Sequence, residues 1–208
     1  MPDHQTVRQI PRHETQINRI VLTMIESDLL LVSATGFVAP IMAVFVTDQV
    51  HGGTVAIAGL ATTVFWVTKS LMQVPVAWYA DKHKGEADDF ALMITGSALA
   101  GVVPFLYYLG ISEVWQVFGV EALNGIAYGL MVPTWLGIFT RHIDASKEST
   151  EWTFHSNAIG IGYAAASAVG GVIAQLYGFR MVFLVVSVFS FLGTVVLLAV
   201  KKPLLGRK

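Results

Sequence analysis

The feature that most limits the possible folds of this chain is an almost uncharged apolar stretch. From Val117 to Phe139 there are 23 residues, and Glu121 is the only charged one. A helix of this length is long enough to cross a lipid bilayer, and the bilayer core admits only helices and closed barrels. Because an ionisable side chain inside such a segment is energetically costly, Glu121 is by default a candidate functional residue.

Five further apolar runs of similar length predict that the chain crosses the bilayer six times. We expect the spans at about 21–46, 54–80, 90–111, 117–139, 154–176 and 179–200. The chain is 54% hydrophobic and 13% charged, whereas soluble domains carry about 25% charge. We therefore predict an all-α integral membrane protein embedded in lipid. Its predicted parts are a polar tail at 1–19, a six-helix domain at 20–200 and a basic tail at 201–208.

The distribution of charge predicts the orientation of these spans. Eleven of the 13 Lys and Arg residues fall in the two tails and in the loops after the second and fourth spans. By the positive-inside rule, both termini are expected in the cytoplasm, on the inner side of the cell membrane. The net charge is −1, so no global basic field favours nucleic acid as a partner. No small-residue cleavage site follows the first apolar run, so we expect no removable signal peptide.

Part of the first span recurs in the fourth span, 93 residues later. The residues Gly36, Pro40 and Thr47 match Gly129, Pro133 and Thr140, and Asp28 falls at the position of Glu121. Glycine and proline are the residues that reshape membrane helices. We therefore interpret the domain as two repeats, at about 20–111 and 112–200, with equivalent first helices.

The ionisable residues within the spans are the candidate site. Glu121 is interpreted as a proton or substrate site, and its structural alternative is an acid paired with Lys69 or Tyr128. Lys69, near the middle of the second span, either binds an anionic substrate or exchanges partners during transport, or it forms a salt bridge with Asp28 or Glu121. Asp28, the repeat-related acid, is a candidate for a role in the same cavity, and His155 is expected at the membrane interface.

Polar and small residues at helical spacing predict which helix faces meet a cavity or another helix. The predicted cavity-lining residues are Thr35, Trp66, Gln73, Asn124, Tyr128 and Trp135, and helix packing is the alternative role of Trp66, Tyr128 and Trp135. The predicted packing residues are Gly125, Gly129, Gly162 and Gly170. The third and sixth spans are nearly free of charge and are expected to face lipid.

The order of these features resembles one six-helix half of a major facilitator superfamily transporter. The loop signature of that family has a glycine, an acid–base pair four residues later, and then a further glycine. Here Asp81 and Lys82 match the pair, Ala77 replaces the first glycine, Gly85 comes one residue late, and Glu86 replaces a base. The resemblance implies that Asp81, Lys82 and Gly85 take part in gating.

The resemblance also implies the architecture and the function. In that family each half consists of two inverted three-helix repeats, and a parallel homodimer of this chain would supply two halves. The implied function is secondary active transport of a small-molecule substrate by alternating access, in one version coupled to protons. Two alternatives stay open: a non-transporting scaffold or regulatory subunit, and the N-terminal half of a longer transporter. The chain contains no Walker loop, GxGxxG fingerprint or HExxH motif, so we expect neither an enzyme, nor a cofactor, nor a bound metal.

Overall fold

Helices make up nearly all of the chain that the computed structural model describes, which is residues 18–83 and 85–205. They are α1 (Arg19–Val38), α2 (Met42–Gln49), α3 (Val55–Lys82), α4 (Glu86–Gly110), α5 (Val114–His142), α6 (Glu148–Tyr177), α7 (Phe179–Leu198) and α8 (Lys201–Leu205). Six segments are long and apolar enough to cross a membrane, the last of them formed by α7 and α8 together. The predicted all-α membrane class with six spans is therefore confirmed.

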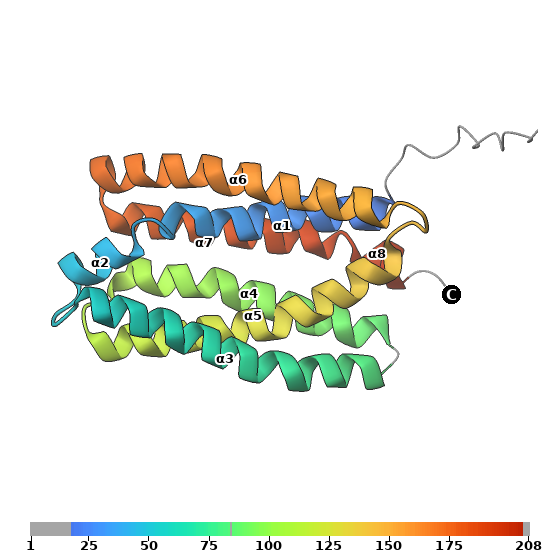
Figure 1. Cartoon of the computed structure of the whole chain (residues 1–208), viewed down its shortest axis with the longest axis horizontal. Coiled ribbons are helices and arrows are strands. Elements are labelled where there is room, and N and C mark those ends of the chain that lie inside the picture. The colour runs from blue at the N-terminus through green and yellow to red at the C-terminus, as the bar shows by residue number, and fades with distance from the viewer. Residues whose placement is uncertain (1–17, 84, 206–208) are drawn as a thin grey trace, which may run out of the picture.

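The six spans form two groups of three, α1 with α6 and α7, and α5 with α3 and α4. Each group therefore contains the first helix of one sequence repeat and two helices of the other repeat. α1 packs against α6 and α7, α5 packs against α3 and α4, and contact between α4 and α7 joins the groups. In Figure 1, α6 runs along the upper edge and α3 along the lower edge, with the other spans between them. These contacts stay the same when each helix of the first repeat is replaced by its equivalent in the second, that is, α1 by α5, α3 by α6 and α4 by α7, and the reverse. This is the symmetry expected of two inverted repeats.

Glycines lie at the close contacts of two helix pairs, α3 with α5 and α1 with α6. All four predicted packing residues lie there: Gly125 and Gly129 of α5 face α3, and Gly162 and Gly170 of α6 face α1. A Cβ atom on Gly125 would lie 2.7 Å from the carbonyl oxygen of Phe65, and one on Gly170 would lie 2.7 Å from the Cα atom of Phe37. A real Cβ atom at either position would clash with the neighbouring backbone, so the close packing of these helices requires glycine there.

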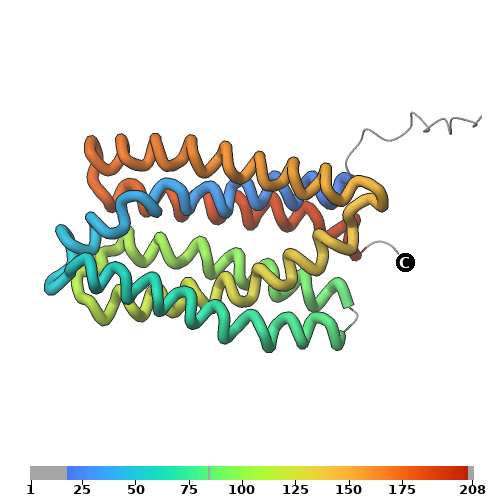
Figure 2. Tube along the Cα trace, viewed as in Figure 1, coloured from blue at the N-terminus to red at the C-terminus, as the bar shows by residue number. Residues whose placement is uncertain are grey.

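The first predicted span is divided into two helices, which corrects the expectation of one helix over 21–46. α1 ends at Val38 and α2 begins at Met42, with a turn around Pro40, and the bend is visible in Figure 2. Pro40 has no N–H to donate to the carbonyl of Gly36, four residues earlier. That carbonyl instead accepts a hydrogen bond from Ser167 Oγ of α6 at 3.1 Å. Pro133, at the equivalent place in the second repeat, stays inside α5.

Two predicted loops are shorter than expected because the helices extend into charged sequence. α4 begins at Glu86 and α6 at Glu148, although the loops were predicted to reach residues 89 and 153. Both first turns are acidic, and negative side chains stabilise the positive end of a helix. Part of the predicted basic tail is also helical, since Lys201–Leu205 forms α8.

One face of α7 is buried, so the prediction that the sixth span faces only lipid is wrong in part. Its three uncharged polar residues, Ser187, Ser190 and Thr194, are all buried in the bundle. Ser187 Oγ donates a hydrogen bond to the carbonyl of Gly101 in α4 at 2.9 Å. The large apolar side chains that α7 exposes, such as Val188, lie between these positions. Small polar residues of this kind hold membrane helices together.

Both ends of the described chain lie at one end of the bundle, together with the α3–α4 and α5–α6 connections (Figure 1). The described basic residues near this end are Arg19, Lys82, Arg141, Lys147, Lys201 and Lys202. Arg180 lies at the opposite end, where its Nη2 donates to the carbonyl of Leu109 at 3.1 Å. The charge asymmetry read from the sequence is therefore an asymmetry between the two ends of one bundle.

Candidate functional site

A cavity of about 540 Å³ lies among the spans, with walls from α1, α3, α4, α5 and α7 and single residues from α2 and α6. This volume is within the range of about 300–1,000 Å³ that is typical of small-molecule sites. Most of its lining side chains are apolar or aromatic. The two charged ones are Lys69 of α3 and Glu121 of α5.

Glu121 lies seven positions after the first residue of α5, about 10 Å along the helix. Its Oε1 accepts a hydrogen bond from the hydroxyl of Tyr107 at 2.8 Å, and its Oε2 accepts one from the amide of Asn124 at 3.3 Å. The predicted alternative partners, Lys69 and Tyr128, are therefore wrong. Tyr107, in α4, was missed because nothing in its local sequence indicates a partner in α5.

Lys69 lies over aromatic rings rather than beside an acid. Its Nζ is 4.3 Å from the ring centroid of Trp66, 5.8 Å from that of Phe65 and 5.9 Å from that of Tyr128. Within the described part of the chain, no carboxylate oxygen lies within 4.0 Å of it, so the predicted salt bridge to Asp28 or Glu121 is wrong. Attraction between a cation and the face of an aromatic ring is strongest for tryptophan.

Asp28 is paired with a residue that was predicted at the membrane interface. Its Oδ2 lies 2.7 Å from Nε2 of His155, which joins α1 to α6, and both side chains are largely buried. The His155 ring packs against the rings of Trp135, Phe139 and Trp152. The depth of His155 in the bilayer stays a prediction, and its pairing with Asp28 was not predicted. The pairing of residues so distant in sequence follows from the α1–α6 contact, which sequence spacing does not reveal.

The structure brings four of the six predicted cavity-lining residues to the cavity, places the other two, Gln73 and Trp135, elsewhere, and also keeps the candidate acid Asp28 out of the cavity. The four are Thr35, Trp66, Asn124 and Tyr128. Gln73 of α3 and Asp28 do not line the cavity. Trp135 is 5% exposed and stacks on Phe139 with ring centroids 4.6 Å apart. The packing alternative thus describes Trp135 correctly.

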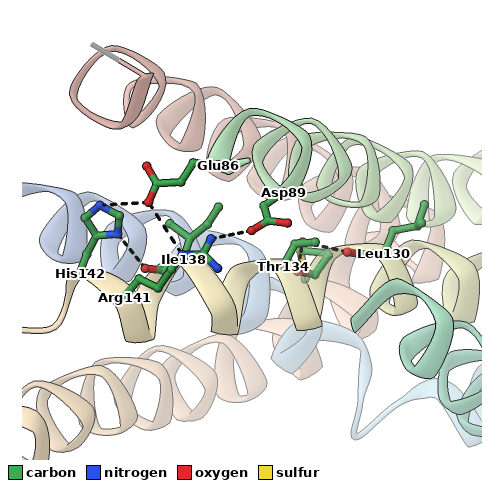
Figure 3. Close-up of polar contacts among 8 residues, drawn as sticks. Glu86, Asp89, Leu130, Thr134, Ile138, Arg141 and His142 are labelled. Atoms are coloured by element: carbon green, nitrogen blue, oxygen red, sulfur yellow. Dashed lines mark hydrogen bonds and ion pairs between the residues drawn. The ribbon is translucent and has the colours of Figure 1, made fainter. Parts of the chain in front are cut away.

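A second polar site lies where α4 meets α5 at the end of the bundle that holds the described termini (Figure 3). Nη2 of Arg141 donates to Oδ2 of the buried Asp89 at 2.5 Å. Glu86 lies 3.8 Å from Arg141 Nε and 3.6 Å from His142 Nε2. The residues of this ionic cluster were not singled out from the sequence, because acids and bases near the end of a span are expected to be solvated.

The predicted gating residues lie next to this ionic cluster. Asp81 and Gly85 line a hollow of about 350 Å³, together with Glu86, Asp89 and Arg141. Lys82 does not line it, and its Nζ is 5.0 Å from the ring centroid of Trp78. The loop that resembles the family signature is therefore in position to contact the α4–α5 junction.

Comparison with known proteins identifies relatives of this chain. A model of the Major Facilitator Superfamily matches residues 29–208. An uncharacterised MFS-type transporter of Methanocaldococcus jannaschii is 27% identical over 149 residues, which is 71% of this chain and 36% of that protein. The multi-drug resistance efflux pump PmrA of Streptococcus pneumoniae is 28% identical over 169 residues, 78% of this chain and 40% of the pump.

A shorter match covers the proton-coupled antiporter flippase LtaA of Staphylococcus epidermidis. It is 26% identical over 87 residues, which is 38% of this chain and 22% of the flippase. The chain thus spans well under half the length of each of these relatives.

Proposed function

Because this chain belongs to the Major Facilitator Superfamily, we propose that it is a secondary active transporter that works by alternating access. The observation that carries this proposal is the membrane-embedded cavity with Lys69 and Glu121 in its walls. Ionisable residues within a span are expensive and mark substrate or proton pathways. A scaffold gains nothing from such a cavity. The names of the relatives, which include an efflux pump and a proton-coupled antiporter, are consistent with transport.

The proposed assembly is a parallel homodimer, with both termini of each chain in the cytoplasm. In the apolar windows of α3 and α6, only 11% of the residues are buried, against 44–61% in the other four spans. These two helices expose large apolar side chains, among them Leu71 and Val74 of α3 and Ile161 and Leu176 of α6. A second half packed on this face would cover them and close the cavity. The protein mass in detergent is then twice the chain mass of 22.5 kDa.

Glu121 is the proposed proton-exchanging group, and its role is tested by transport driven by a pH gradient. A thermal-shift screen of the purified chain against metabolites and drugs identifies a ligand, and a radiolabelled form of that ligand serves as the transport probe. The native chain in proteoliposomes should accumulate this probe when a pH gradient is imposed. Glu121→Gln keeps the size of the side chain but fixes its charge at zero, so it should lose gradient-driven uptake and retain exchange. Asp28→Asn is the comparison at the repeat-related acid.

Three outcomes would count against these assignments. Normal pH dependence in Glu121→Gln would show that this acid is structural. Absence of any uptake by the well-folded native chain would remove transport and favour the scaffold alternative. A clean monomer that still transports would remove the homodimer.

A further inference from the structure

The charge balance of the cavity indicates which solutes it can hold. Its lining contains one cation and one carboxylate, and the rest is apolar or uncharged polar. Among the uncharged polar residues are two threonines, an asparagine and a serine: Thr35, Thr62, Asn124 and Ser190. The chemical class of the ligand therefore depends on whether Lys69 or Glu121 is already satisfied within the protein.

Glu121 is satisfied by the protein. Each of its two oxygens accepts a hydrogen bond, one from Tyr107 and one from Asn124. Tyr107 is itself fixed, because it is 3% exposed and its ring stacks on Phe183 at 4.7 Å. Both oxygens of this carboxylate are thus occupied in this conformation, so a cationic ligand would have to displace these bonds in order to reach it.

Lys69 is not satisfied in the same way. Its ammonium group meets three aromatic rings, and no carboxylate of the described residues lies within 4.0 Å of it. A cation within a span is costly unless an anion or a set of hydrogen-bond acceptors compensates for the loss of water. Trp66 and Phe65 beside it form an apolar surface that fits the body of a ligand. The cavity thus presents a positive charge at the edge of an aromatic wall.

We propose that this cavity binds an amphipathic organic anion: an apolar ring system or chain that carries one carboxylate. The carboxylate pairs with the Lys69 ammonium, and the apolar body lies against the aromatic wall. This assignment of substrate class rests on the proposed function, because it takes the cavity to be the transport site. The volume of about 540 Å³ accommodates a ligand of that size.

Three probes with one apolar body and different charges test the proposal: naphthylacetate, naphthylmethylamine and naphthylmethanol. Their binding to the purified full chain in detergent is measured by titration calorimetry. We expect naphthylacetate to bind at least about tenfold more tightly than the amine and the alcohol, since charge-assisted pairing is the distinguishing contact. Equal affinities, tighter binding of the amine, or no binding of any probe would overturn the proposal.

Variants of the lysine separate the charge from the packing. Lys69→Met keeps the long stem and removes the ammonium, so it should abolish the preference for the acid. Lys69→Arg should keep that preference, which also guards against a trivial effect of misfolding. The control is Lys201→Met, because Lys201 is exposed in α8 and does not line the cavity. Retention of the preference in Lys69→Met, or its loss in Lys201→Met, would contradict the assignment.

Flux measurements with the same probes distinguish this proposal from the proposed function. Proteoliposomes that transport all three probes equally would remove the anion preference and leave transport in place. Binding that selects the acid through Lys69 without any flux would support the substrate class as a binding property and remove transport.

Discussion

Replacement of Gly170 by alanine should destabilise the protein, whereas the same change at Gly171 should not. The added Cβ at Gly170 would lie 2.7 Å from Cα and 2.8 Å from the carbonyl carbon of Phe37. These are backbone atoms of α1, so no side-chain rotation can relieve the contact. At Gly171, the next residue along α6, a Cβ meets no atom within 4 Å.

The change in the free energy of unfolding follows from the surroundings of Gly170 and Gly171. Overpacking of a well-packed contact costs about 1–3 kcal/mol, so Gly170→Ala should lower the free energy of unfolding by that amount. Gly171→Ala gains helix propensity of about 0.5–1 kcal/mol, which makes it neutral or slightly stabilising. For a chain of this size, 1 kcal/mol corresponds to about 2–4 °C in the melting temperature. The melting temperature of Gly170→Ala should therefore fall, whereas that of Gly171→Ala should stay the same or rise slightly.

The assay is thermal unfolding of the full chain in detergent, monitored by its near-ultraviolet circular dichroism signal. A second pair tests the same principle in the other repeat. Gly125→Ala meets the backbone of Phe65 and Lys69, whereas Gly119→Ala meets no atom within 4 Å. Equal melting temperatures for Gly170→Ala and Gly171→Ala would refute the close approach of α6 to α1.

Three further predictions concern contacts between the proposed subunits and contacts of buried carboxylates. In the proposed homodimer, a cysteine at Asp81 should cross-link to one at residues 150–154 of the sister chain; cross-links within one chain alone would contradict this. Asp89→Asn should lower the free energy of unfolding by about 1–2 kcal/mol, since it weakens a buried charge-assisted bond, while the exposed Asp88→Asn should leave the melting temperature unchanged. His155→Leu removes the side-chain partner of a buried carboxylate and should cost about 1–3 kcal/mol in chemical unfolding. Adding Asp28→Asn to His155→Leu neutralises that carboxylate and should recover most of this loss. Absence of any recovery would refute the pairing.

The fold was predictable because hydropathy and glycine spacing act within single helices. Apolar runs fix where the chain can cross a bilayer. The glycine pairs of α5 and α6 likewise predict faces that permit close approach, and the structure places Gly125 and Gly170 in such contacts. The break at Pro40 was missed because a proline within a membrane helix is often tolerated. Pro133 is tolerated inside α5, so the presence of a proline alone does not show whether a helix breaks or continues.

The candidate site was predictable in its location but not in its pairings. Glu121 and Lys69 were identified by their charge within apolar sequence, and both line one cavity. Their partners depend on the rotation and axial position of whole helices, which tertiary packing decides. Thus Tyr107 reaches Glu121 from α4, and His155 reaches Asp28 across 127 positions of sequence.

Each of the two repeat-related acids is paired across the repeats, toward opposite ends of the bundle. Asp28 follows the first residue of α1 by nine positions, and Glu121 follows that of α5 by seven. α1 and α5 run in opposite directions (Figure 1), so the acids lie toward opposite ends. Each acid has a partner in the other repeat, His155 for Asp28 and Tyr107 for Glu121. Both contacts therefore join the two repeats within one group of spans: Asp28 and His155 within the α1–α6–α7 group, and Glu121 and Tyr107 within the α3–α4–α5 group. The inverted repeat thus supplies one such contact toward each end of the bundle from two similar helices.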